Sequence, residues 1–136
     1  MVIERDIISL PNYERGMVMT FYDSHGKPIA YSDNGEDIYT FEGKPVAYLN
    51  GNKVYGFNGH HLGWFENGWI RDKSGRCVFF TENATGSGPA KPAKSVKPMK
   101  SVKSVKSVKS VKQVASAKAT NISSWSQLSV VQFFEQ

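Results

Sequence analysis

The fold is decided by the stretch Ile38-Tyr-Thr-Phe-Glu-Gly43-Lys-Pro-Val-Ala-Tyr48, which returns in altered form as Val54-Tyr-Gly-Phe-Asn-Gly59-His-His-Leu-Gly-Trp64. The same pattern occurs once before and once after these two copies. Four glycines, spaced by 17, 16 and 16 residues, mark the units: Gly26, Gly43, Gly59 and Gly75. Self-similarity at a steady spacing is typical of a fold built from one supersecondary unit.

Five positions of the unit keep their character in the four copies, which makes chance agreement a poor explanation. Before the glycine, the fifth position is Phe21, Ile38, Val54 and Ile70, and the fourth is Tyr22, Tyr39, Tyr55 and Arg71. After the glycine, the third is Ile29, Val46, Leu62 and Val78, the fourth is Ala30, Ala47, Gly63 and Phe79, and the fifth is Tyr31, Tyr48, Trp64 and Phe80.

Each unit is predicted to be a β-hairpin, because two short runs rich in β-formers flank a turn. Asn-Gly pairs favour type I′ turns at Asn34-Gly35, Asn50-Gly51, Asn58-Gly59 and Asn67-Gly68. The third and fifth positions after the glycine are expected to face the core. The fourth, small in three units, is expected where another backbone or ring comes close.

Four hairpins over residues 19–84 predict an all-β domain, since one hairpin alone is marginally stable in water. Closing them in a pseudo-fourfold arrangement would shelter most strand edges. Residues 1–18 are expected to form an N-terminal cover segment. An extended basic C-terminal tail follows, as a Lys-rich low-complexity linker over 85–120 and an apolar segment over 121–136.

The chain resembles the four-fold β flower proteins of bacteria. The resemblance rests on Gly43-Lys-Pro-Val-Ala-Tyr48, Gly59-His-His-Leu-Gly-Trp64, Gly68-Trp-Ile-Arg-Asp72 and Gly75-Arg-Cys-Val-Phe-Phe80, and extends to the Lys-rich tail and Trp125-Ser126. It implies four β-hairpins around a pseudo-fourfold axis. It implies no activity and no catalytic residues.

Charge divides the chain. Residues 1–84 carry eight Lys and Arg against eleven Asp and Glu, or −3, and residues 85–136 carry nine Lys against one Glu, or +8. Lysine stands at every third position eight times in succession, at Lys91, Lys94, Lys97, Lys100, Lys103, Lys106, Lys109 and Lys112. A period of three matches polyproline II, which would align the lysines about 9 Å apart.

Two interpretations of this tail stay open. It is either an electrostatic arm for nucleic acid or an anionic surface, or a solvated spacer that lysine keeps soluble and extended. We favour the spacer, because the tail lacks the aromatic and arginine residues of a dedicated binder.

The last residues differ from the tail. Ser124-Trp-Ser-Gln127 has capping-box spacing before an apolar run, which predicts a short helix, with a strand as the alternative. The side chains expected to dock on the flower, or to await a partner, are Trp125, Leu128, Phe133 and Phe134.

The fourth unit departs from the others at Arg71, Cys77 and Phe79. We consider a recognition patch there, because aromatic and arginine side chains are favoured interface anchors: Trp64, Trp69, Arg71 and Asp72. The simpler alternative is that the last unit closes the ring and so has a different environment. Asp23 and Asp72 are expected to support turns by accepting hydrogen bonds from nearby amides.

Chemistry is not indicated. His25, His60, His61 and Cys77 lack a standard zinc spacing, and no phosphate loop or nucleophile motif is present. With one cysteine, an intramolecular disulfide is excluded. We expect no catalytic, cofactor-binding or metal-binding residue, and neither a signal peptide nor a transmembrane segment.

The prediction is therefore a cytoplasmic, non-catalytic interaction module, which associates with protein partners or with itself through the flower surface and the aromatic C-terminus. The alternative is sequence-independent binding of nucleic acid, or of an anionic surface, through the lysine arm. A small-molecule enzyme ranks third.

Overall fold

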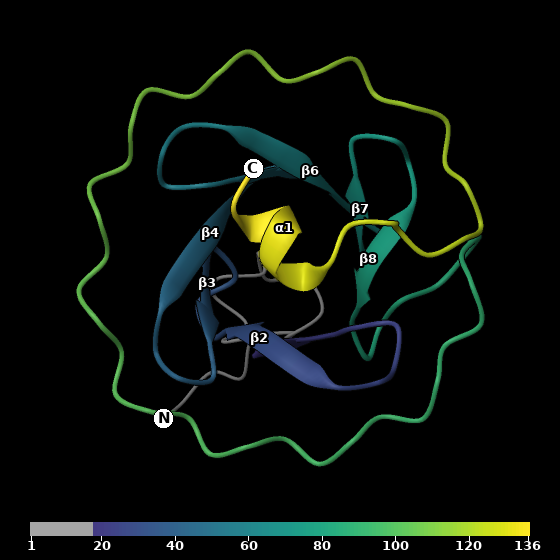
Figure 1. Ribbon diagram of the computed structural model, residues 1–136, viewed down its shortest axis with the longest axis horizontal. Coiled ribbons are helices and arrows are strands. Elements are labelled where there is room, and N and C mark those ends of the chain that lie inside the picture. The colour runs from purple at the N-terminus through teal and green to yellow at the C-terminus, as the bar shows by residue number, and fades with distance from the viewer. Residues whose placement is uncertain (1–17) are drawn as a thin grey trace, which may run out of the picture.

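The structure is a computed structural model that describes residues 18–136. Eight antiparallel strands pair in chain order and close into a barrel (Figure 1). They are β1 (Met19–Tyr22), β2 (Pro28–Ser32), β3 (Asp37–Thr40), β4 (Pro45–Asn50), β5 (Lys53–Tyr55), β6 (His61–Glu66), β7 (Trp69–Asp72) and β8 (Cys77–Phe80). The barrel closes where Tyr22 of β1 pairs with Phe80 of β8. The predicted all-β fold of four hairpins in a closed arrangement is confirmed.

The turn inside each hairpin is held by a short polar side chain. Asp23 accepts hydrogen bonds from the amides of His25 and Lys27, at 2.9 and 3.0 Å. Asp72 does the same for Ser74 and Arg76, at 2.9 and 3.1 Å. The role predicted for these two acids is therefore confirmed.

The turns between hairpins differ from the prediction. Among the described residues, only Asn67 combines a non-glycine side chain with a positive φ, of 51°, and Gly68 follows at 81°. Asn34 instead accepts hydrogen bonds from the amides of Glu36 and Asp37, at 2.9 and 2.8 Å. The positive φ angles of a type I′ turn therefore occur at Asn67-Gly68, as predicted, but Asn34, Asn50 and Asn58 do not have them.

A bulge in every hairpin overturns the predicted orientation of the second strand. Phe21 pairs with Ala30 and Tyr22 with Pro28, so Ile29 has no partner across the hairpin. The other pairs skip the matching residues in the same way: Val46, Leu62 and Val78. The extra residue breaks the period-two alternation. As a result, the fourth position after the glycine fills the barrel and the fifth faces outward. The third position packs in the core as predicted, since Leu62 and Val78 belong to the central cluster and Ile29 and Val46 pack against it.

The interior follows from this register. Phe21, Ala30, Ile38, Ala47, Val54, Ile70 and Phe79 are fully buried in one central cluster. The outward-facing aromatic residues form separate buried clusters, one of them around Tyr31, Tyr39 and Phe41. A barrel surface that carries buried aromatic rings must be covered by another part of the chain.

A short helix, α1 (Val130–Phe134), lies over one end of the barrel (Figure 1). Phe133 is fully buried and meets Phe79 edge-on, with ring centroids 5.9 Å apart. The predicted helix exists, but its capping box is Ser129 with Gln132 instead of Ser124 with Gln127. This single helix of residues 18–136 has five residues, too few to cross a bilayer.

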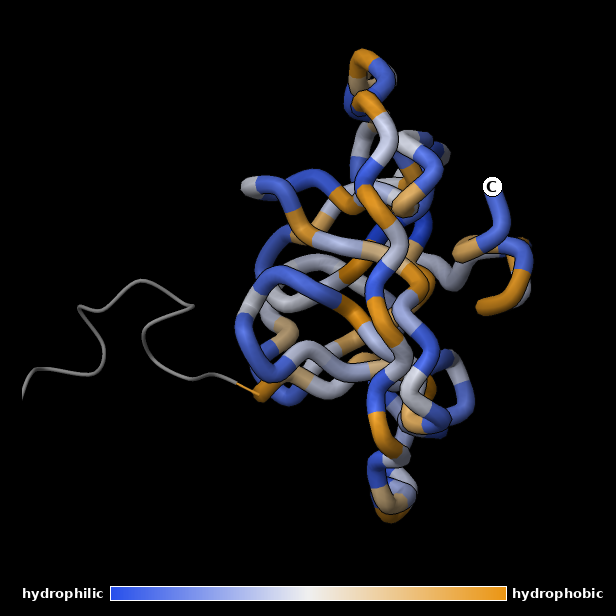
Figure 2. Tube along the Cα trace, turned by 90° about the vertical axis from the view of Figure 1, so that its left-hand side faces the viewer, coloured by the Kyte–Doolittle hydropathy of each residue, from blue (hydrophilic) through white to orange (hydrophobic). Residues whose placement is uncertain are grey.

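The predicted cover segment over 1–18 falls outside the described residues except for Val18, which is half-exposed. Seen from the side, the C-terminal segment with α1 lies to one side of a narrow band of chain (Figure 2). That band is the lysine-rich stretch.

Candidate functional site: a lysine belt closed at the fourth hairpin

Residues 85–123, hereafter the belt, run once around the barrel (Figure 1). Amides nine residues apart along the belt donate to the carbonyls of the four repeat glycines. The pairs are Ser95 with Gly26 at 2.8 Å, Ser104 with Gly43 at 2.8 Å, Gln113 with Gly59 at 2.8 Å and Ile122 with Gly75 at 3.0 Å. Three triplets of the tail therefore match one hairpin, and the predicted linker is not free of the domain.

The repeat glycines let the belt approach this closely. Gly43 has φ 89°, and a Cβ atom built there would lie 2.1 Å from the carbonyl oxygen of Val102. Gly26, Gly59 and Gly75 also have positive φ, and a Cβ atom built on each would lie 1.9–2.2 Å from a belt carbonyl oxygen, again nine residues apart: Ala93, Val111 and Thr120. Glycine is needed both for the turn and for the contact.

The belt lysines turn inward onto the outward-facing tyrosines. Lys103 lies over the ring of Tyr39 with its Nζ 4.9 Å from the centroid, and Lys100 lies over Tyr31 at 4.4 Å. Lys109 lies over Tyr48 at 4.3 Å, and Lys94 is 5.9 Å from Tyr22. Each such contact contributes on the order of 0.5–1 kcal/mol at an exposed site.

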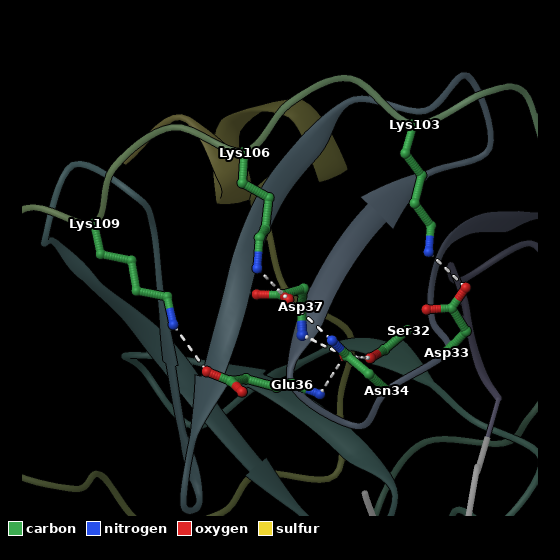
Figure 3. A network of polar contacts seen from close by, with 8 residues as sticks. All are labelled: Ser32, Asp33, Asn34, Glu36, Asp37, Lys103, Lys106 and Lys109. Carbon is green, nitrogen blue, oxygen red and sulfur yellow. Dashed lines mark hydrogen bonds and ion pairs between the residues drawn. The ribbon is translucent and has the colours of Figure 1, made fainter.

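Belt lysines also form ion pairs with carboxylates at and beside the turn between the first two hairpins (Figure 3). Lys103 pairs with Asp33 at 2.6 Å, Lys106 with Asp37 at 2.8 Å and Lys109 with Glu36 at 2.8 Å. Further pairs join Lys118 to Glu66 at 2.8 Å and Lys97 to Glu82 at 3.7 Å. The acidic barrel and the basic tail are thus complementary within one molecule.

Asp37 is the buried member of this network. Its Oδ2 accepts from Lys106 and, at 2.9 Å, from the amide group of Asn34 (Figure 3). Burial alone would raise the pKa of Asp37, but the hydrogen bonds from Lys106 and Asn34 and the positive charge of Lys106 outweigh it and lower the pKa. The carboxylate is therefore held ionised beneath the belt.

Departures from the repeat in the barrel coincide with departures in the belt. One hairpin after Asp37 the barrel carries Lys53, and nine residues after Lys106 the belt carries Ala115, so two lysines do not meet. Likewise Arg71 takes the tyrosine position of the fourth unit, and the matching belt residue is Asn121 instead of a lysine. The two sequences compensate each other at matched positions.

Arg71 joins the two ends of the belt. Its guanidinium is buried and donates to the carbonyls of Ser87, at the start of the belt, and of Ile122, at its end. It also donates to Gly75 at 2.9 Å. In the third hairpin the Tyr55 hydroxyl makes the corresponding bond to Gln113, at 3.0 Å. Arg71 therefore makes the belt hydrogen bond that Tyr55 makes in the third hairpin, and adds a second one that holds the start of the belt beside its end.

Aromatic residues complete this closure. The indole N–H of Trp69 donates to the carbonyl of Thr85 at 3.0 Å. Trp125 packs against Trp69 and Phe80, with ring centroids 6.0 and 6.1 Å away. Its neighbour Ser126 donates a short hydrogen bond from its hydroxyl to Asp72. The end of the belt is thus fixed beside its start.

The structure gives the residues of the predicted recognition patch internal partners. Trp64, Trp69, Arg71 and Asp72 are buried, with 2–7% of their surface exposed. Three of them lie on β7 around the closure, and Trp64 pairs with Arg71 from β6. Of the predicted docking residues, Trp125 and the two C-terminal phenylalanines pack against the barrel, while Leu128 stays partly exposed.

The candidate metal ligands are engaged separately. His61 accepts a hydrogen bond from the belt amide of Ser116 at 3.2 Å, and burial lowers its pKa. Burial raises the pKa of Cys77 to about 11. Within residues 18–136, no three His, Cys, Asp or Glu side chains come together closely enough to hold a metal ion.

The outer edge of the belt was not singled out from the sequence. Hydrophobic residues recur along the band (Figure 2), and in the sequence they stand at every third position from Val96 to Val114. Seven of them, hereafter the apolar arc, are each more than 90% exposed: Val96, Met99, Val102, Val105, Val108, Val111 and Val114. The signal was present in the tail's third column, which is Val after residue 99.

The family model described as 4-fold beta flower protein matches residues 19–134. This chain belongs to the 4-fold beta flower protein family. The matched region of this flower protein takes in the barrel, the whole belt and all of α1. No curated protein and no solved structure matches the chain.

Proposed function

We propose that this flower protein is a non-catalytic interaction module whose binding surface is the apolar arc. The observation that carries the proposal is the exposure of seven apolar side chains in one continuous row, from Val96 to Val114. Scattered exposed apolar residues need no explanation, but a contiguous row is a feature of interaction sites.

The polar and aromatic groups of the fourth hairpin and the C-terminus are less accessible to a partner. Arg71 and Trp69 are occupied by belt carbonyls, and Phe133 fills the end of the barrel. Binding through these groups would require the belt or α1 to leave first. The apolar arc needs no such rearrangement.

The test is affinity capture with the full chain from a lysate of the source cells. The arc variant replaces Val102, Val105 and Val108 by Ser. A control variant replaces two exposed valines that lie off the belt, Val18 and Val131, by Ser. We expect the arc variant to lose proteins that the wild type and the control retain. Equal capture by all three would contradict the proposal.

Nucleic-acid binding through the lysines is the weaker alternative, because a polyanion would have to compete with carboxylates such as Asp33, Glu36 and Asp37 for them. Fluorescence anisotropy with a short labelled DNA tests it. The interaction-module proposal predicts negligible binding at about 150 mM salt. Tight binding that weakens with salt, at a slope of about −0.9 per phosphate contact, would favour the arm instead.

A further inference from the structure

The apolar arc stands apart from every other exposed apolar residue that the structure describes. Its seven side chains are 91–96% exposed, whereas the next values are 57% for Val131 and 50% for Val18. The arc is continuous along the belt from the first hairpin to the third, since its ends flank Ser95, bonded to Gly26, and Gln113, bonded to Gly59.

The arc is electrically neutral on its outer side. Between Met99 and Val111 the lysines point to the barrel, where they contact tyrosine rings and turn carboxylates. Serine is the remaining residue type in this stretch. Because these lysines already have partners within the molecule, this edge suits an apolar partner better than an anionic membrane or a nucleic acid.

The spacing of the arc is regular. An extended chain that repeats every three residues places successive valines about 9 Å apart if it rises about 3.1 Å per residue. A row of equal side chains at equal distances is matched by another row of the same spacing, offset by half a step. A surface with that spacing, neutrality and apolar character exists on every copy of this chain, namely the arc itself.

From this match we propose that the apolar arc binds the apolar arc of a second copy of this chain. The inference rests on the proposed function, because it names the partner of the same surface. Valines of one belt lie between valines of the other, and apolar surface leaves water without bringing charges together.

The contact is small. Two convex edges meet along a short part of the arc, so roughly three valines from each copy become buried. The area buried by such a patch lies well below the roughly 1,600 Å² of a standard stable interface. At about 25 cal/mol per Å², its burial contributes correspondingly little free energy of association. Association is therefore weak and depends on concentration.

Sedimentation velocity of the purified full chain, from about 10 μM to about 1 mM, tests the inference. We expect the weight-average mass to rise above the 15.1 kDa of one chain, by roughly half or more at the upper end, where contacts of millimolar affinity become populated. The rise should persist in about 0.5 M NaCl, because the contact carries no charge.

The arc variant Val102→Ser, Val105→Ser, Val108→Ser should remain at 15.1 kDa throughout, with an unchanged circular dichroism spectrum. The control variant Val18→Ser, Val131→Ser should associate like the wild type. A wild-type mass that stays at 15.1 kDa, or equal association by the arc variant, would overturn the inference. If the wild type stays monomeric while arc-dependent capture from lysate persists, the inference fails and the proposed function stands.

Discussion

Gly43 is required for two reasons: its φ is 89°, and its α-carbon faces the belt carbonyl of Val102 with no room for a Cβ atom. Gly51 offers a matched control: its φ is also positive, at 61°, but a Cβ atom added there would have no neighbour within 4 Å. Gly51→Ala should incur only the backbone cost, about 1 kcal/mol, whereas Gly43→Ala must also displace Val102.

We therefore expect Gly43→Ala to lower the free energy of unfolding by about 2–4 kcal/mol, and Gly51→Ala by about 1 kcal/mol. Urea unfolding of both variants measures the difference. Hydrogen exchange at the Ser104 amide, which donates to Gly43, should rise only in the first variant. Equal losses in the two variants would show that the belt contact contributes nothing.

Arg71 can be tested by restoring the repeat. Arg71→Tyr leaves the carbonyl of Ser87 without its buried donor and takes one of two donors from the carbonyl of Gly75, so it should destabilise the fold by about 2–4 kcal/mol. In the first two units a tyrosine at this position meets a belt lysine, as Tyr22 meets Lys94 and Tyr39 meets Lys103. Adding Asn121→Lys should therefore recover part of the loss.

A double-mutant cycle of Arg71→Tyr and Asn121→Lys, followed by urea unfolding, measures this recovery. Asn121→Lys alone serves as the second arm, because it places a lysine near the Arg71 guanidinium and should be unfavourable. Additive effects of the two changes would contradict the compensation between barrel and belt.

At the scale of elements, the belt is a segment of fixed length. Ser95 and Ile122 are 27 positions apart and span three hairpins, nine positions for each. Deleting Lys103-Ser-Val105 would shorten the path by about 9 Å. The shortened belt could then not keep its hydrogen bonds to the repeat glycines on both sides of the deletion.

We expect this deletion to lower the midpoint of thermal unfolding more than insertion of one extra Lys-Ser-Val triplet after Val105. An insertion can bulge outward, whereas a shortened chain cannot stretch. Differential scanning calorimetry of both variants decides the order. A deletion that leaves the midpoint unchanged would mean that the contacts of the belt do not stabilise the barrel.

The hairpins could be predicted from the sequence because each carries its own signal, a turn glycine between apolar columns. The bulges could not, because a skipped residue such as Ile29 leaves the columns unchanged while it reverses which face they occupy. The period-two assumption therefore placed Tyr31 in the interior, although it lies under the belt.

The belt was beyond prediction for a different reason. A triplet such as Lys-Ser-Val repeats identically, so it defines a period but no register on the barrel. The register comes from non-repeated residues toward the end of the tail, among them Gln113, whose side chain accepts from the His61 amide, and Trp125, which bridges to Cys77. Only the paired exceptions, Lys53 with Ala115 and Arg71 with Asn121, carried that information in the sequence.

For the whole molecule, the ionised carboxylates beneath the belt should make the free energy of unfolding depend on pH in the acid range. The pKa of Asp37 is lowered, as is that of Asp72, where burial would raise it but the hydrogen bonds from Ser126, Ser74 and Arg76 prevail. A carboxyl with a lowered folded pKa stabilises the fold above its unfolded pKa. That contribution is lost as the pH falls through the folded value.

The free energy of unfolding should accordingly fall as the pH drops below 3.8, the ordinary carboxyl value. Urea unfolding between pH 7 and about pH 2 measures the slope. Asp37→Asn should be less stable at pH 7 and show a shallower acid loss. An identical acid slope in this variant would contradict the ionised contact with Lys106.

Tryptic cleavage tests most directly whether belt and barrel form one folded unit, because every belt lysine except Lys91 and Lys97, which precede proline, is a potential cleavage site. In a free arm these sites would be cut at once, leaving a barrel fragment. Mass spectrometry of timed digests of the native full chain follows each site. The structure predicts that cleavage in the belt is slow and accelerates with global unfolding in urea. Rapid cutting between residues 94 and 112 under native conditions, with the barrel left intact, would contradict it.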